Sequence, residues 1–214
     1  MKFVILIKGN GEFMKKNYDR LVIILIIIVF IFLLGLYVKD TLKVKKQNTN
    51  EVVEKIESYN YTLKSNSSSY YKEKFLELKD ILENNKSEEE YAKVLAQLFI
   101  IDFYTLDGKI SNTDIGGIDF VLPSIKDNFS LKANETIYKY IENTTYGKNT
   151  ELPIVSEVQI SNIKNVTYTY NNEVDKSSYE IKVKINYQKD LGYEKEKMLY
   201  FVHSDNKLFL VEMK

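Results

Sequence analysis

Residues 179–187 have the sequence YEIKVKINY, the clearest strand pattern in the chain. Apolar and aromatic side chains alternate with Glu180, Lys182 and Lys184, and a period of two is typical of a β-strand with one buried face. Residues 166–170, just upstream, place a valine and two tyrosines on one face in the same way. The C-terminal part of the chain is therefore predicted to form a β-sheet.

Two further strands are predicted at residues 198–204 and 208–213, with Asp205-Asn206 as the tight turn between them. Both segments carry apolar residues on both faces of the strand. This pattern predicts either a central position in the sheet or a second covered surface.

Helical patterns precede the strands. Apolar side chains recur at helical spacing over residues 70–83. A second helix is predicted to start at Ser87, where Glu90 three positions later completes a capping box. Residues 98–101 are apolar all round this helix, so its end should be deeply buried.

A third helix is predicted from residue 130 or 131 to residue 143, with Ile137 and Ile141 on one face. Residues 51–58 can continue as helix, and residues 59–69 begin like a strand and end in a turn. Helices followed by four sequential strands predict an α+β domain, in which about three helices pack on one face of a curved four-stranded antiparallel sheet.

An apolar segment near the N-terminus, residues 21–38, has the sequence LVIILIIIVFIFLLGLYV and carries no charge. As a helix with a rise of about 1.5 Å per residue, it would cover roughly 27 Å, close to the hydrocarbon core of a bilayer. No small-residue cleavage pattern follows it. The segment is therefore predicted to be an uncleaved, single-pass transmembrane helix.

This segment divides the chain. Residues 1–20 are predicted to be a short cytoplasmic lead, with Met14 as an alternative start. Residues 39–50 are predicted to be a polar stalk, and residues 51–214 an extracytoplasmic domain. Basic residues flank the segment almost equally, so the charge bias scarcely favours either orientation. We expect the domain outside the membrane, which is usual for a short lead and a long C-terminal domain.

The composition excludes several chemistries. Cysteine is absent, which excludes disulfides, thiolate zinc sites and a cysteine nucleophile. Residues 51–214 hold 21 basic and 27 acidic residues, and Arg20, outside that range, is the only arginine. Because arginine is the preferred residue for contacts to phosphates and bases, no nucleic-acid partner is expected.

Two motifs could carry chemistry. His203, the only histidine, is followed by Ser204 and Asp205, but neighbours on a strand point to opposite faces, so a structural or surface histidine is expected. The loop at residues 107–114 resembles the second half of a calcium loop. Its register puts Phe103 at the first ligand position, where an oxygen ligand is needed, so a chance match is expected.

Three further features have structural interpretations. Gly116-Gly117 could form a backbone anion nest, although a turn is expected. Asp102 lies beside an apolar helix end, where burial could raise the pKa of its carboxyl group; a position on the polar side or a cap on the following loop is the alternative that we favour. The run at residues 88–90 suits a helix N-terminus. We predict no catalytic, cofactor-binding or metal-binding residue.

Tyrosine is abundant in the predicted domain. It is enriched at protein interfaces, but it is also a normal residue of strands. We expect a structural role, with an interface as the alternative. The tyrosines concerned are Tyr59, Tyr61, Tyr70, Tyr71, Tyr168, Tyr170, Tyr179, Tyr187, Tyr193 and Tyr200.

A short lead, one anchor, helices and a terminal antiparallel sheet, over residues 14–214, resemble the bitopic scaffold subunits of conjugation and type IV secretion channels. Their outer domains have the cone-shaped fold of nuclear transport factor two. Residues 99–121 (FIIDFYTLDGKISNTDIGGIDFV) and 134–147 (NETIYKYIENTTYG) are also similar to stretches of membrane proteins of unknown function from low-GC Gram-positive bacteria. These resemblances imply the cone-shaped fold but no activity.

The leading hypothesis is a membrane-anchored, non-enzymatic extracytoplasmic domain whose partners are the membrane and other envelope proteins or a second copy of itself. The two-faced strands and the tyrosines motivate it. A small-ligand or enzymatic pocket is the second hypothesis, because a cone-shaped sheet can enclose a pocket; Asp102 would be its most interesting residue. The third is a cytosol-facing, membrane-tethered regulatory module. No cofactor is expected.

Overall fold

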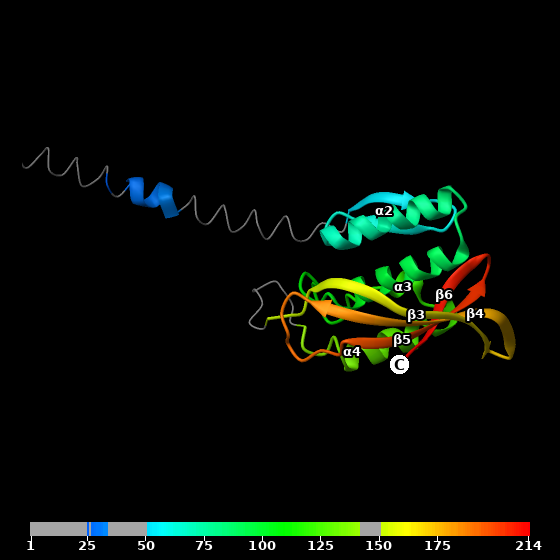
Figure 1. The fold of residues 1–214 in the computed structure, drawn as a ribbon. Coiled ribbons are helices and arrows are strands. Elements are labelled where there is room, and N and C mark those ends of the chain that lie inside the picture. The colour runs from blue at the N-terminus through cyan, green and yellow to red at the C-terminus, as the bar shows by residue number, and fades with distance from the viewer. Residues whose placement is uncertain (1–24, 26, 34–50, 142–150) are drawn as a thin grey trace, which may run out of the picture. The chain divides into compact units, whose positions relative to one another are not determined.

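The computed structural model describes residues 25, 27–33, 51–141 and 151–214 (Figure 1). Beyond the helical residues near position 30, the elements in chain order are β1 Val52–Ile56, β2 Tyr61–Lys64, α2 Ser69–Glu83, α3 Glu88–Tyr104, the 3-10 helices η1 Ile118–Phe120 and η2 Pro123–Ile125, α4 Lys126–Glu135, β3 Val155–Tyr170, β4 Glu173–Tyr187, β5 Glu196–Ser204 and β6 Lys207–Met213.

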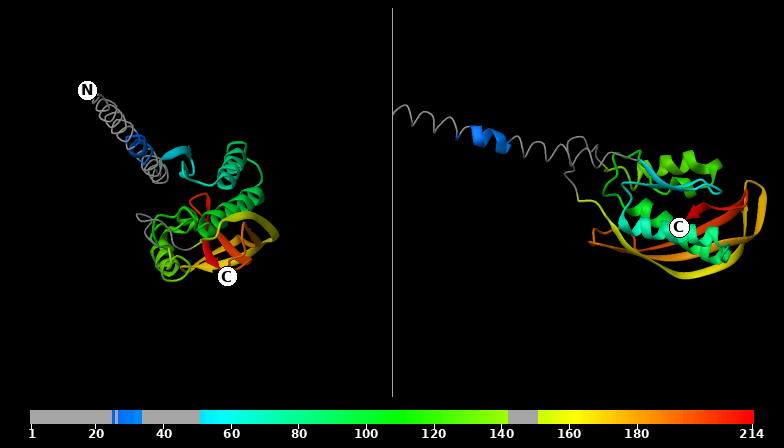
Figure 2. Two further views of the ribbon diagram at one scale, coloured as in Figure 1. Left: turned by 90° about the vertical axis from the view of Figure 1, so that its left-hand side faces the viewer. Right: turned by 90° about the horizontal axis from the view of Figure 1, so that it is seen from above.

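The chain divides into two compact units, Met1–Thr49 and Asn50–Lys214. In the second unit, a four-stranded sheet has the order β3-β4-β5-β6 with antiparallel neighbours, and β1 and β2 form a separate antiparallel hairpin. Helix α3 packs on the sheet at β3 and β4, and α2 packs on α3 (Figures 1 and 2). The predicted α+β class and four-stranded antiparallel sheet are confirmed.

Helix α3 is buried over most of its length because its apolar residues are not confined to one stripe. Its N-terminus is capped by Ser87, whose Oγ accepts the N–H of Glu90 at 3.3 Å. Leu98, Phe99 and Ile100 near its end are fully buried. The predicted start of this helix and the deep burial of its end are confirmed.

The alternation at residues 179–187 places one face of β4 in the core. Ile181, Val183 and Ile185 are buried, and Ile181 pairs across the sheet with the buried Leu199 of β5. Cross-strand partners share a face, so the two strands cover α3 with one continuous apolar surface.

Two of the three hairpins of the sheet, β3–β4 and β5–β6, close with two residues in the left-handed region. Asn171 and Asn172 have φ angles of 47° and 65°, and Asp205 and Asn206 have φ angles of 49° and 59°. Two successive positive φ angles define the tight turn whose twist matches that of antiparallel strands, and Asn and Asp adopt this conformation readily. The predicted turn at Asp205-Asn206 is confirmed.

The sheet is strongly curled, so the end of β3 contacts strands that are not its neighbours. The ring of Tyr168 lies 5.4 Å from that of Tyr200 on β5, and the Tyr168 hydroxyl donates to Glu212 on β6 at 2.9 Å. The Tyr170 hydroxyl donates to the His203 carbonyl at 3.0 Å. The predicted curvature of the sheet follows from these contacts.

Strand β5 is covered on both faces. Phe201 and Val202 follow one another and therefore point to opposite faces, yet both are fully buried. β5 also has a strand on each side. Its two-faced apolar sequence therefore reflects both a central position and a second covered surface, the two interpretations that the pattern predicted.

Two predicted helices need correction. Residues 51–58 were expected to be helical but contain β1, because Val52, Glu54, Lys55 and Ile56 pair with β2. The third predicted helix begins earlier than expected. Helix α4 starts at Lys126, directly after the helical turn that Pro123 opens, and it ends at Glu135 because Thr136 leaves helical geometry with a ψ of −94°.

The predicted transmembrane helix at residues 21–38 also needs correction. Within the described residues, no helix is long and apolar enough to cross a membrane. Residues 25 and 27–33 are helical. The rest of that segment, the predicted lead and the predicted stalk lie outside the described residues.

The cap on α3 leads to a stability prediction. We expect Ser87→Ala to lower the free energy of unfolding by about 1 kcal/mol, because the N–H of Glu90 loses its acceptor. Urea unfolding followed by circular dichroism measures the change. Ser87→Asn, which retains a capping oxygen, should stay close to the wild type; equal losses in the two variants would contradict the role of the cap.

Candidate functional site: a groove between α4 and β6

A groove of about 490 Å³ lies between the end of α3, the segment η1–η2, α4 and β6. Its apolar walls come from all four elements. The side chains that form them include Phe103, Val121, Phe129, Leu210, Val211 and Met213. Of these, Phe103, Val121 and Leu210 are buried, so the walls are continuous with the hydrophobic core.

Aromatic contacts fix the wall formed by α4. The ring of Phe129 lies 5.3 Å from that of Phe103 and 6.0 Å from that of Phe99. The buried Tyr138, just after α4, donates its hydroxyl hydrogen to the Phe103 carbonyl at 2.7 Å and accepts the Gly116 N–H at 3.0 Å. These contacts hold α4 against the end of α3 and define one side of the groove.

The wall formed by β6 contains a β-bulge. Tyr200 pairs with Glu212 and Phe201 with Leu210, so Val211 is inserted between two paired positions. Bulges redirect side chains and occur often beside functional sites. Here the bulge falls on a residue that lines the groove.

The outer edge of β6 is partly closed. The Leu122 N–H donates to the Leu210 carbonyl at 2.9 Å, and Val121 and Leu210 form a parallel bridge. Close by, the Tyr104 hydroxyl contacts the sulfur of Met213 at 3.7 Å. The groove therefore has walls that the fold holds in place before any ligand arrives.

One lysine at the groove forms no ion pair with any described residue. The polar side chains that line it are Asn128, Lys132, Thr136 and Glu212. Glu212 accepts the Tyr168 hydroxyl at 2.9 Å and lies 3.0 Å from the Lys214 ammonium. Within the part of the chain that the structure describes, Lys132 forms no ion pair. The groove therefore has an apolar floor and a cationic rim.

A second hollow lies beside His203, but its volume is only about 190 Å³ and its lining includes Lys86, Glu88 and Asn206. Small-molecule sites usually enclose about 300–1,000 Å³ and have mostly apolar walls. The groove between α4 and β6 fits that description, and the smaller hollow does not.

Asp102 caps the loop that follows α3. One carboxylate oxygen lies 2.6 Å from the Lys109 ammonium, and the other accepts the Gly117 N–H at 2.7 Å. Burial raises the pKa of Asp102, but the charge of Lys109 and its hydrogen bonds outweigh burial and hold that pKa below its usual range. The proposed rise in pKa is therefore wrong, and the favoured capping role is confirmed.

The Gly-Gly pair closes the same loop. A Cβ on Gly116 would lie 2.1 Å from the Asp102 carbonyl oxygen, and Gly117 has a φ of 70°, so both positions require glycine. Nearby, the Asp114 carboxylate accepts the Ile110 N–H at 3.1 Å. The expected turn at Gly116-Gly117 is confirmed, and the structure assigns Asp114 a contact inside the loop.

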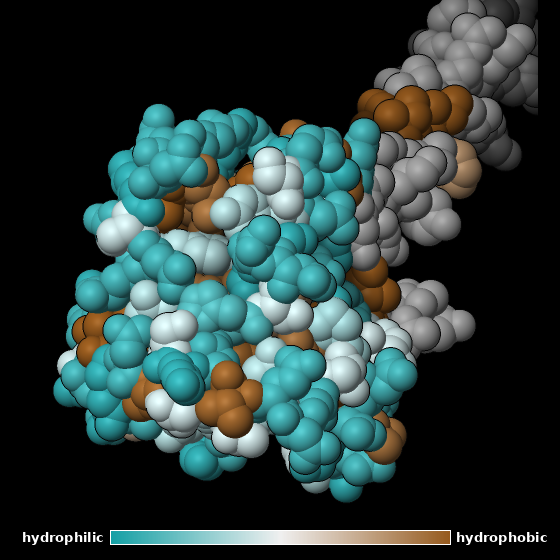
Figure 3. Space-filling model, turned by 90° about the vertical axis from the view of Figure 1, so that its right-hand side faces the viewer, coloured by the Kyte–Doolittle hydropathy of each residue, from teal (hydrophilic) through white to brown (hydrophobic). Residues whose placement is uncertain are grey.

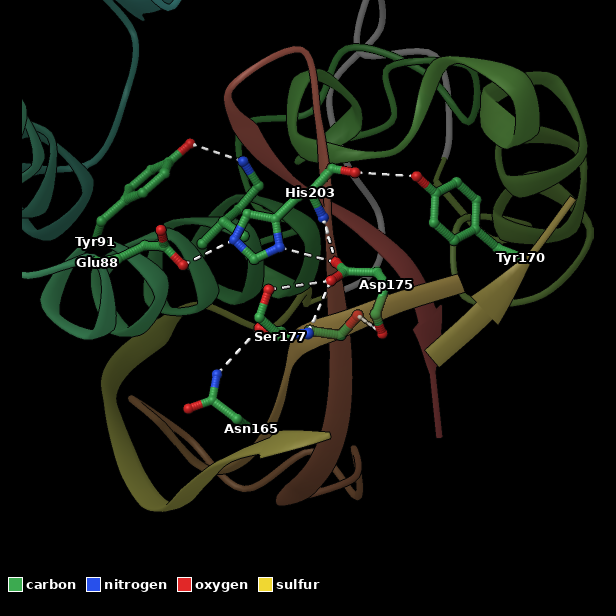
Figure 4. A network of polar contacts seen from close by, with 9 residues as sticks. Glu88, Tyr91, Asn165, Tyr170, Asp175, Ser177 and His203 are labelled. Carbon is green, nitrogen blue, oxygen red and sulfur yellow. Dashed lines mark hydrogen bonds and ion pairs between the residues drawn. The ribbon is translucent and has the colours of Figure 1, made fainter. Parts of the chain in front are cut away.

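His203 lies between two carboxylates from distant parts of the chain (Figure 4). Its Nδ1 is 2.8 Å from an Asp175 oxygen on β4, and its Nε2 is 2.8 Å from a Glu88 oxygen in the first turn of α3. A neutral imidazole has one N–H, so both nitrogens can donate only when the ring is protonated. The expected structural role of His203 is confirmed.

Asp175 is the centre of this cluster. One oxygen accepts the Ser177 N–H and hydroxyl at 2.9 and 3.2 Å; the other accepts the backbone and ring N–H groups of His203, both at 2.8 Å. Burial raises the pKa of Asp175, but these hydrogen bonds outweigh it and hold that pKa well below its usual range. The Ser177 hydroxyl faces this carboxylate, so the cluster differs from a serine–histidine–acid triad.

Several of the tyrosines have partners inside the domain. Tyr61 and Tyr91 share a hydrogen bond of 2.7 Å between their hydroxyl groups. Tyr70 accepts the Val158 N–H at 3.0 Å and so closes part of the free edge of β3. Tyr187 donates to the Glu194 carbonyl at 2.9 Å. The expected structural role is confirmed for these residues.

No pattern in the sequence was interpreted as part of the groove. Ile125, Phe129 and Ala133 line the groove and recur every four residues, which is a helical pattern. This pattern was not recognised because the helix was predicted to start at residue 130 or 131. The bulge at Val211 has no comparable local signal, because the pairing of β6 with β5 decides where it falls. Residues 142–147, which the predicted third helix and the resemblance include in part, lie outside the described residues.

Comparison of the chain with protein-family models, with characterised proteins and with solved structures gave no match in any of the three. The resemblance to channel scaffold subunits with a domain like nuclear transport factor two stays a prediction. A function must therefore be argued from the geometry of the domain.

The two carboxylates around His203 lead to a prediction about pH. Burial lowers the pKa of His203, but the hydrogen bonds that its ring donates to Asp175 and Glu88 outweigh burial, and the pKa is raised above the ordinary value of 6.5. A group whose pKa is raised by folding stabilises the fold below its unfolded pKa and loses that contribution as pH rises through the folded pKa. The free energy of unfolding should therefore fall as the pH rises above about 6.5.

Urea unfolding at several pH values tests this expectation. His203→Gln should lack the fall, and because the chain has a single histidine no other imidazole titrates in this range. Parallel pH profiles for the wild type and the variant would contradict the charged state of His203.

A second prediction concerns Gly116. We expect Gly116→Ala to lower the free energy of unfolding by about 2 kcal/mol or more, because the new methyl group would overlap the Asp102 carbonyl. Gly108→Ala is the matched control: its Cβ would meet nothing within 4 Å, and its φ of 94° should cost only about 1 kcal/mol. Equal losses in urea unfolding would show that the close approach is unimportant.

Proposed function

We propose that the unit Asn50–Lys214 is a non-enzymatic binding domain that takes an apolar ligand in the groove between α4 and β6. The observation that carries the proposal is the groove itself, about 490 Å³ in volume, with apolar walls from four elements. Its size and lining are those of a small-molecule site. The proposal keeps the small-ligand part of the second hypothesis and leaves out its enzymatic part. Asp102, the residue of interest in that hypothesis, is not among the residues that line the groove.

The polar residues support binding more than catalysis. Both ring nitrogens of His203 face carboxylates, and both oxygens of Asp102 have donors inside the domain. General acid–base catalysis needs a titratable group that is free to reach its substrate. At the groove, Glu212 is held by Tyr168 and Lys214.

Contact through a broad apolar face has less support. The end of the domain that carries the hairpin turns is mostly hydrophilic, and its hydrophobic side chains form small separate patches (Figure 3). The two-faced strands at residues 198–213 and the tyrosines motivated an interface; of these, β5 and several tyrosines are used inside the fold. Envelope partners, self-association, the absence of a nucleic-acid partner and the side of the membrane on which the domain lies stay predictions.

Methionine methyl NMR on the full chain tests the proposal. The chain has four methionines: Met213 lines the groove, and Met198 precedes the buried Leu199, so its side chain lies on the opposite face of β5. Decan-1-ol should shift the Met213 methyl signal saturably and leave the Met198 signal in place. Met213→Leu and Met198→Leu assign the two signals.

A plugged groove provides the matched comparison. Asn128 is exposed and lines the groove, so Asn128→Trp should fill it and abolish the response of Met213. Leu131 is 57% exposed on the same helix and is not part of the lining, so Leu131→Trp should bind decan-1-ol like the wild type. An unchanged Met213 signal in the wild type, or an equal response in Asn128→Trp, would exclude the groove as the binding site.

A further inference from the structure

We infer that the ligand of the groove is an anionic amphiphile: an apolar chain that fills the groove and a single negative head group that pairs with Lys132. The inference rests on the proposed function and deepens it. Lys132 is exposed on α4, one position before the buried Ala133 and three after Phe129, and all three line the groove. A lysine there can lay its aliphatic stem along the apolar wall and keep its ammonium at the rim.

The balance of charge at the rim selects the sign of the head group. The two ionisable side chains in the lining are Lys132 and Glu212. Glu212 already has the Tyr168 hydroxyl and the Lys214 ammonium as partners, whereas Lys132 forms no ion pair within the described residues. A carboxylate placed at Lys132 would complete an ion pair, and an amine there would meet like charge.

The backbone of β6 favours a small molecule over an extended peptide. A peptide that added to the sheet would need the outward carbonyl of Leu210, but the Leu122 N–H already occupies it at 2.9 Å. The groove is bounded by the end of α3, by η1–η2 and by α4 as well as by β6. A compact apolar body with one charged end fits these limits.

Three probes of equal chain length separate the head group from the chain. Calorimetric titration of the full chain with decanoate, decan-1-ol and decylamine gives three affinities at neutral pH. Decanoate should bind up to roughly fivefold more tightly than decan-1-ol, the gain typical of one ion pair near the surface, and decylamine should bind most weakly. High salt should reduce the advantage of decanoate.

Substitutions at position 132 identify the group responsible. Lys132→Met should lower the affinity for decanoate to that for decan-1-ol and leave decan-1-ol unchanged. Lys132→Glu should reverse the order, so that decylamine binds more tightly than decanoate. Lys126→Met, a control on the same helix outside the lining, should change neither affinity.

The outcomes separate the two proposals. If decan-1-ol and decanoate bind equally in the wild type and in Lys132→Glu, the binding groove stands and the anionic head group is excluded. If none of the three probes binds the wild type, the proposed function itself falls. Preference for decanoate together with its reversal in Lys132→Glu would establish the ligand class.

Discussion

The burial of α3 on nearly every side is the constraint on which the rest of this domain depends. A helix that is apolar all round has no face that can remain in water, so other elements must surround it. Strands β3 and β4 of the sheet pack on α3, and helix α2 packs on it as well. Near the end of α3, Phe99 and Phe103 contact Phe129 of α4. The groove forms where this cover is incomplete, beside Phe103.

The second constraint is that the backbone at the end of β5 needs hydrogen-bond partners, because the sheet is curled and β5 extends past the part of β4 that pairs with it. At His203, side chains take the place of a neighbouring strand: Asp175 accepts the backbone N–H, and Tyr170 donates to the carbonyl. Among the described residues, no buried side-chain nitrogen or oxygen lacks a hydrogen-bond partner. Part of the charged cluster around His203 therefore provides hydrogen-bond partners for the backbone groups at the end of β5. The same cluster connects β4 and β5 to the start of α3.

Neither of these two features supplies the proposed binding site, which is the groove between α4 and β6. Its apolar walls belong to the core, and its position follows from the bulge at Val211 and from the contacts of Tyr138. Its rim carries the ammonium of Lys132, which forms no ion pair with a described residue. A site built in this way needs little rearrangement to accept a ligand, which reduces the entropic cost of binding.

The sequence by itself determined the features that local chemistry controls. The N-cap at Ser87, the turn at Asp205-Asn206 and the alternation at residues 179–187 each depend on residues within a few positions, and each is present. The tertiary structure alone decided the bulge at Val211 and the partners of His203. Glu88 is 115 residues away from His203 in the chain. Such pairings depend on how helices and strands pack. They cannot be predicted from a short sequence pattern, because the free energy of packing depends on residues that are distant in the chain.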